Sequence, residues 1–247
     1  MIGFIVNLII MIALLVGGVF FIYKQQEKLK GKVINILIPA IIFLFLLYQI
    51  LEFYCKGIDW NFYNSLPTAN ISPFMFTLLF INVFLPKPIK KYIYTLTALL
   101  CIGMVIAGFA TDVSYIVRGY SFHICIAMDC TNHILFALFG IYLVITKQTH
   151  TKIRDNIISG SILFGIVAIM IILNIIFKTS FFGLNMYGDH SIYGVKLVSN
   201  SILSAVIYCC GLGALLVLGY VFEYLFVLPK LLKIQPQEKQ GKSTEVK

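Results

Sequence analysis

Long apolar segments separated by short polar connections restrict the fold of this chain more than any other feature. Seven segments have this character: residues 2–23, 33–54, 66–85, 92–109, 121–146, 157–177 and 199–228. A helix needs about 20 residues to cross a hydrocarbon core about 30 Å thick, and it satisfies its backbone hydrogen bonds within the segment. The pattern predicts an all-α, polytopic helical membrane protein with seven transmembrane helices.

The composition agrees with this class of protein. Charged residues make up 12% of the 247 residues and hydrophobic residues 60%, whereas a soluble domain carries about a quarter charged residues. The formal net charge is +9, but the cations lie in connections and a tail, where they orient membrane helices. We therefore expect membrane lipids and no nucleic acid as partners. The six cysteines have no zinc-ligand spacing and are interpreted as small buried hydrophobic residues.

The distribution of positive charge predicts the orientation. Fifteen of the 19 Lys and Arg residues follow the first, third, fifth or seventh segment. Because cytoplasmic connections carry the excess of positive charge, we expect the N-terminus outside and the C-terminus in the cytoplasm of a bacterial plasma membrane. Residues 1–229 form the predicted bundle, and residues 230–247 form a polar, disordered cytoplasmic tail. The first segment has its charges after it, unlike a cleaved signal peptide.

The segment of residues 121–146 contains the most informative polar side chains. Asp129 and His133 are separated by four residues and are therefore neighbours on a helix. An ionisable residue at this depth in a membrane is costly and is a functional candidate by default. We interpret Asp129 and His133 as candidate catalytic residues and as the floor of a polar pocket.

Further polar residues fall in the outer halves of the predicted spans. Together with that pair they form the candidate ligand-binding set: Glu52, Asn70, Ser72, His123, Asp129, His133, Asn174 and Asn200. This set predicts an outward-facing pocket that binds or transports a small or lipid-derived molecule. The alternative is that these side chains join helices through interhelical hydrogen bonds, which is the favoured interpretation for Asn and Ser. The inner halves contain few polar residues, among them Asn82 and Glu223.

The third segment is interrupted near its start. Ser72 and Pro73 are typical of a helix N-cap followed by the first helical residue, which leaves about 13 residues of regular helix, too few to span alone. A shortened, proline-interrupted span indicates a binding site. The alternative is a tilted helix with a kinked end.

Several chemistries lack their sequence signals. The last segment has no lysine for a retinal Schiff base, and there is no HExxH, P-loop or GxSxG motif. His123 and His133 are ten residues apart, which is not a standard zinc-ligand spacing. We therefore expect neither a metal nor a cofactor.

Short motifs spread along the chain resemble those of the YwaF-type bacterial integral membrane proteins, which are relatives of a eukaryotic transmembrane lipid acyltransferase group. The residues that carry the resemblance are Glu52, Leu66, Pro67, Ser72, His133, Asn185 and Tyr187. Where that family tends to read LPLHLC in its third span, this chain reads LPTANI, with Ile71 in place of the cysteine and Ala69 in place of the histidine.

The resemblance implies acyl transfer, and this chain lacks the cysteine at that position. A hydroxyl of Ser72, Thr68 or Thr131 beside His133 would then act as the nucleophile. The alternatives to the binding or transport hypothesis are therefore a membrane-embedded acyltransferase or hydrolase and an accessory protein without catalysis. The enzyme hypothesis requires a hydroxyl within about 3.2 Å of a His133 ring nitrogen.

Overall fold

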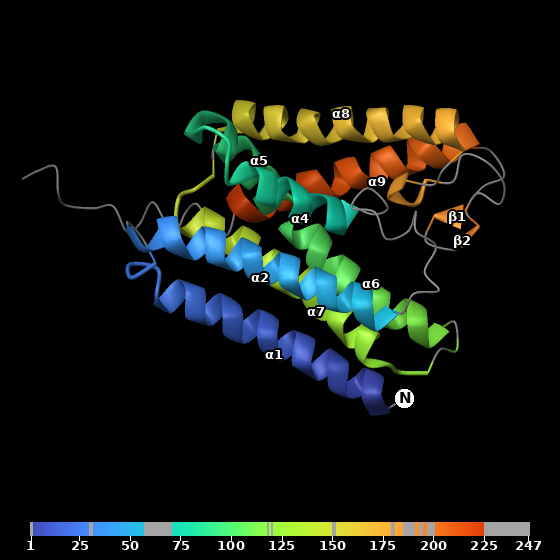
Figure 1. Cartoon of the computed structure of the whole chain (residues 1–247), viewed down its shortest axis with the longest axis horizontal. Helices are drawn as coiled ribbons and strands as arrows, with labels where there is room; N and C mark the ends of the chain where they lie inside the picture. The colour runs from blue at the N-terminus through green and yellow to red at the C-terminus, as the bar shows by residue number, and fades with distance from the viewer. Residues whose placement is uncertain are drawn as a thin grey trace, which may run out of the picture.

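The computed structural model describes residues 2–29, 32–56, 71–117, 119, 121–149, 152–178, 181–184, 191–192, 195–196 and 201–224. Eight α-helices lie in this part of the chain: α1 (Ile2–Lys24), α2 (Lys32–Lys56), α4 (Ile71–Asn82), α5 (Lys87–Leu99), α6 (Cys101–Val117), α7 (Ile124–Ile145), α8 (Ile153–Phe177) and α9 (Ser201–Phe222). A short 3-10 helix, η1 (Phe181–Gly183), follows α8, and β1 (Ser191–Ile192) pairs antiparallel with β2 (Val195–Lys196). The fold is all-α apart from this small hairpin (Figure 1).

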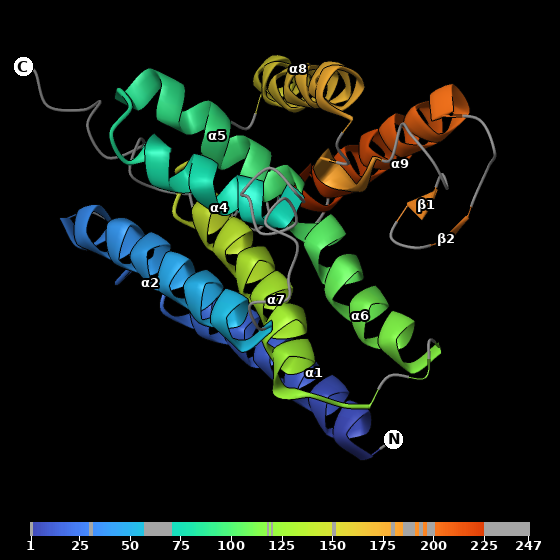
Figure 2. The same ribbon diagram turned by 45° about the vertical axis from the view of Figure 1, so that its right-hand side comes forward.

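Helix α7 lies at the centre of the bundle. It contacts α1, α2, α5 and α6, and Figure 2 shows it between α2 and α6. In the most apolar 18-residue stretch of α7, 67% of the residues are buried. The corresponding stretches of α1, α8 and α9 have 17%, 28% and 22% of their residues buried. The predicted segment of residues 121–146 is therefore the core helix, although α7 itself begins later, at Ile124.

The outer helices expose apolar side chains instead of polar ones. Ile9 and Val16 of α1 and Ile176 of α8 are exposed, and these two helices lie on opposite sides of the molecule (Figure 1). Within the described residues, four helices are long and apolar enough to cross a membrane, and the number of spans is five if α5 and α6 form one bent span. Together these features indicate a multi-pass helical membrane protein that contacts lipid.

The predicted bounds of the fourth span, residues 92–109, are wrong, because this stretch is a bent pair of helices, α5 and α6, that runs from Lys87 to Val117 with an angle of 43° between them. The Thr97 hydroxyl donates to the carbonyl of Ile93 at 2.9 Å, a side-chain bond that bends helices. The Thr97 carbonyl also faces Gly140 of α7, where an added Cβ would lie 3.0 Å away. The predicted connection of residues 111–120 is wrong as well, since α6 continues to Val117.

Helix α4 is short, as the sequence predicts, with 12 residues and a length of about 18 Å. Ser72 lies in its first turn and not at the N-cap, because the helix already includes Ile71. Pro73 is compatible with this start, because proline is tolerated in the first turn of a helix. The sequence predicts irregular backbone over residues 66–71; Ile71 is instead the first residue of α4, and residues 66–70 lie outside the described residues.

Aromatic side chains hold α4 against α2 and α7. The ring centroids of Phe76 and Phe136 are 5.3 Å apart, those of Phe45 and Phe76 are 5.1 Å apart, and those of Phe45 and Phe139 are 5.7 Å apart. The Phe76–Phe136 and Phe45–Phe139 pairs are edge-to-face, a geometry that adds to the energy of burying the rings. This packing places the first turn of α4 beside the middle of α7.

Candidate functional site

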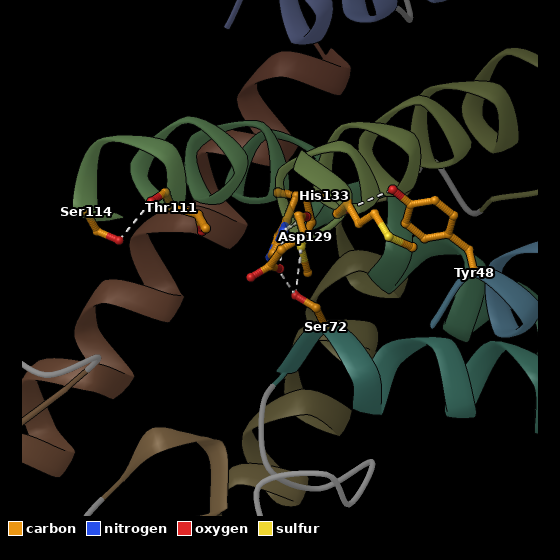
Figure 3. Close-up of polar contacts among 8 residues, drawn as sticks. Tyr48, Ser72, Thr111, Ser114, Asp129 and His133 are labelled. Carbon is orange, nitrogen blue, oxygen red and sulfur yellow. Dashed lines mark hydrogen bonds and ion pairs between the residues drawn. The ribbon is translucent and has the colours of Figure 1, made fainter. Parts of the chain in front are cut away.

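Ser72 and His133 meet where α4 approaches α7. The Oγ atom of Ser72 is 3.0 Å from Nε2 of His133, which is within the limit that the enzyme hypothesis sets. On the other side of the ring, Nδ1 lies 2.8 Å from the main-chain oxygen of Asp129 and 3.5 Å from its Oδ1. Figure 3 shows the Ser72 side chain pointing from α4 towards His133 and Asp129 of α7.

The two partners of Nδ1 assign the tautomer of His133. Both are oxygens of Asp129, and neither the carbonyl nor the carboxylate can donate a hydrogen bond. Nδ1 must therefore carry the proton, and Nε2 of the neutral ring has a free lone pair. The Ser72 hydroxyl then donates to Nε2, which is the arrangement in which an imidazole removes a proton from a serine.

The site is partly shielded. The side chains of His133 and Asp129 are 13% and 21% exposed. Met104 of α6 lies behind the serine, with its sulfur 3.6 Å from Ser72 Oγ, and thioether sulfur is a weak acceptor. Of the two acceptors near this hydroxyl, the imidazole nitrogen is therefore the stronger one. The side chains of Ser72, His133 and Asp129 are all partly exposed.

Two further contacts fix the position of α7 around the site. An added Cβ on Gly108 of α6 would lie 3.2 Å from the carbonyl of Cys130 and 3.3 Å from the Cβ of His133. The Tyr48 hydroxyl of α2 donates to the carbonyl of Met128 at 3.0 Å, next to Asp129. At Gly108, α6 and α7 therefore pack closely with no side chain between them.

A second polar cluster lies beside the site and was missed in part by sequence reasoning. Asn7 of α1 donates through Nδ2 to Oδ1 of Asp112 at 2.8 Å, and the two residues are 1% and 3% exposed. Asp112 follows Gly108, which packs against His133, by one turn of α6. The available signal was that Asn7 is the only polar side chain in residues 2–22.

The structure places Asn174 elsewhere. Its Nδ2 donates to the carbonyls of Phe181 at 3.0 Å and Leu184 at 3.1 Å, and its Oδ1 accepts from the amide of Phe181 at 2.7 Å. Its amide therefore ties the η1 turn to α8. Within that turn Phe182 has a φ of 59°, and its buried ring packs against Phe74 with centroids 5.4 Å apart.

The remaining predicted residues do not join Ser72, His133 and Asp129 in the described contacts. His123 precedes α7 and is exposed. Asn70, Asn200 and Thr68 lie outside the described residues, as does the side chain of Glu52, although its backbone belongs to α2. Among the residues that the structure describes, no group of three or more His, Cys, Asp or Glu side chains could hold a metal ion.

Comparison of the chain with family models, curated proteins and solved structures gives no match in any of the three. The geometry of Ser72, His133 and Asp129 is therefore the basis for assigning a function.

Proposed function

We propose that this protein is a membrane-embedded acyltransferase or hydrolase in which Ser72 is the nucleophile and His133 the general base. The observation that carries the proposal is the 3.0 Å contact from Ser72 Oγ to His133 Nε2, together with the Asp129 oxygens that hold Nδ1 protonated. A nucleophile, a base and a group that orients the base form the usual arrangement for covalent catalysis.

The first step transfers an acyl group from an ester to the enzyme. Ser72 Oγ attacks the ester carbonyl carbon while its proton moves to Nε2 of His133. The tetrahedral intermediate then collapses, the bond from carbon to the leaving oxygen breaks, and Nε2 returns the proton to that oxygen. The products are a free alcohol and an ester of Ser72. The carboxylate of Asp129, 3.5 Å from Nδ1, stabilises the imidazolium that exists between the two proton transfers.

The first turn of α4 supplies positive potential for the negative oxygen of the intermediate. The first N–H groups of a helix have no acceptor within the helix, and the helix dipole is positive at this end. Ser72 lies in this turn, so the oxyanion forms next to it. Pro73 has no N–H, so the residue after the nucleophile cannot donate a main-chain hydrogen bond to the oxyanion.

The second step releases the acyl group. A hydroxyl group of an acceptor gives its proton to Nε2 and attacks the Ser72 ester, and Nε2 then returns the proton to Ser72. Water as the acceptor makes the reaction hydrolysis, and a lipid alcohol makes it acyl transfer. The resemblance to YwaF-type proteins favours a lipid substrate, with Ser72 acting in place of the cysteine one position earlier.

We also propose seven spans, with the N-terminus outside and the C-terminus in the cytoplasm of a bacterial plasma membrane. The seven would be α1, α2, the segment that contains α4, the bent α5–α6 pair, α7, α8 and α9. The excess of Lys and Arg in alternate connections supports this orientation. Ser72 and Asp129 would then lie in the outer half of the membrane.

A second candidate function is binding or transport of a small or lipid-derived molecule in an outward-facing pocket without covalent chemistry. The 43° break between α5 and α6 favours it, because discontinuous helices are frequent at the substrate sites of transporters. Asp129 and His133 would then contact the ligand directly.

A serine-reactive fluorophosphonate probe distinguishes the two candidates. We expect the protein in lipid nanodiscs to become labelled on Ser72, and Ser72→Ala and His133→Ala to abolish labelling. The matched control is Ser114→Ala, because the Ser114 hydroxyl only donates to the carbonyl of Thr111 at 2.8 Å on α6 (Figure 3). The enzyme hypothesis would be contradicted if the folded wild-type protein is not labelled, or if labelling persists in Ser72→Ala.

A further inference from the structure

Glu223 is a buried carboxylate that the proposed reaction does not use. It is 4% exposed, and among the residues that the structure describes neither Oε1 nor Oε2 has a hydrogen-bond partner. It directly follows Phe222, the last residue of α9. An ionised carboxylate without a partner is costly to bury, so this side chain requires a counter-charge.

The break between α5 and α6 lies next to this carboxylate. Gly219 of α9 contacts the backbone of Leu99, the last residue of α5, so closely that a Cβ would overlap the Leu99 carbonyl. Glu223 follows Gly219 by one turn on the same side of α9, and helix side chains lean towards the N-terminus, which here is towards Gly219. The carboxylate also acts electrostatically on the thiol of Cys101, the first residue of α6.

Leu99 is the last residue of α5, and its carbonyl is one of the four that an α-helix leaves without an intrahelical donor at its C-terminus. The main-chain hydrogen bonds that cross the break join Leu100 N to Leu96 O at 3.0 Å and Met104 N to Leu100 O at 2.9 Å. Neither uses the carbonyl of Leu99, and the C-terminal end of α5 carries negative dipole potential. Two acceptors, one charged and one at a helix C-terminus, therefore face the same interface with α9.

We propose that Glu223 and the Leu99 carbonyl bind a small monovalent cation, either a proton or Na⁺, at the α5–α6 break. Either ion neutralises the carboxylate and links it to the carbonyl. A proton makes the carboxyl group an O–H donor to the carbonyl, and Na⁺ is coordinated by the oxygens of both groups. Carbonyls at the ends of broken membrane helices bind Na⁺ and protons in this way. The site is independent of Ser72, and a bound cation would tie α9 to the bend.

The two ions are tested separately on the full chain in nanodiscs. For Na⁺, thermal unfolding is followed in sodium, potassium and choline chloride at equal ionic strength. For the proton, infrared difference spectra are searched for the carbonyl band of a protonated carboxyl group, which shifts on exchange into D₂O. Both measurements are repeated on Glu223→Gln, which is neutral and similar in shape, and on Glu27→Gln as the control at an exposed carboxylate.

We expect one of two results in the wild type and in Glu27→Gln. Either sodium raises the unfolding temperature relative to potassium and choline, or an exchangeable carboxyl band is present, and Glu223→Gln abolishes whichever signal is seen. A wild-type far-UV circular dichroism spectrum and a single thermal unfolding transition of Glu223→Gln show that this variant is folded. Absence of both signals from the wild type, or their persistence in Glu223→Gln, would overturn the proposal.

Discussion

Gly108 of α6 faces His133 of α7 so closely that a methyl group on residue 108 would lie 3.3 Å from the Cβ of His133. The other near atoms are the carbonyl of Cys130 at 3.2 Å and Cδ1 of Ile134 at 3.3 Å. The Cys130 carbonyl is part of the α7 backbone and the Cβ of His133 is bonded directly to it, so neither can rotate away. The geometry of the site therefore depends on the absence of a side chain at residue 108.

We expect Gly108→Ala to separate α6 from α7 and to destabilise the protein by about 1–3 kcal/mol, as overpacking does in other cores. The rate of fluorophosphonate labelling should fall several-fold, because the imidazole moves with α7. Gly165→Ala on α8 is the control, since nothing lies within 4 Å of its added Cβ. Equal behaviour of the two variants would show that close approach at Gly108 is not needed.

Asp129→Asn and His133→Ala should differ strongly in the rate of Ser72 labelling. The substitution at Asp129 removes the carboxylate at 3.5 Å but keeps the main-chain oxygen at 2.8 Å, so Nδ1 stays protonated. We expect a loss of roughly 10- to 100-fold, well short of the roughly 10⁴-fold loss that follows from a wrong tautomer. His133→Ala removes the base and should reach that larger loss. If Asp129→Asn is as inactive as His133→Ala, the main-chain oxygen does not hold the ring.

Asn7→Leu should destabilise the bundle more than Asp112→Asn does. The first variant leaves the buried Asp112 carboxylate without the donor now at 2.8 Å, at a cost of about 1–3 kcal/mol. The second puts an amide there that can still pair with Asn7. Thermal unfolding in nanodiscs measures both, with Asn35→Leu on an exposed position of α2 as the control. A neutral Asn7→Leu would mean that the pair contributes nothing to packing of α1 on α6.

Asn174→Ala should loosen the η1 turn and leave the rate of Ser72 labelling close to that of the wild type. Three hydrogen bonds to residues 181–184 are lost, and the left-handed conformation of Phe182 (φ 59°) is strained for a side chain of this size. Hydrogen–deuterium exchange at the amide of Phe181 should accelerate. Ile172→Ala, an exposed residue of the same helix, should leave that exchange unchanged, and unchanged exchange in both variants would refute the role of Asn174.

Cysteine labelling tests the orientation. Lys91 and Lys178 are both exposed, and the proposed topology places the first inside and the second outside. In intact cells, a membrane-impermeant maleimide should therefore react with Lys178→Cys and not with Lys91→Cys. Reaction at residue 91 would reverse the predicted topology.

The sequence predicted the class of protein and the importance of one helix with good accuracy. The predicted first span of residues 2–23 differs from α1 by one residue, because length and apolarity along a single segment are local properties. The same holds for Asp129 and His133, whose contact at i and i+4 follows from helix geometry alone. The bend at Leu100 was not predictable, since it depends on where the Thr97 carbonyl meets Gly140 of another helix.

By itself, then, the sequence determined that the chain forms apolar helices and that Asp129 and His133 lie one turn apart on one of them. Only the tertiary structure decided that the Ser72 hydroxyl reaches His133, since Ser72 and His133 are 61 residues apart. It also brought Asn7 to Asp112 across 105 residues. The physical reason is that periodicity fixes the face on which a side chain lies, whereas the rotation and depth of each helix are set by packing against its neighbours.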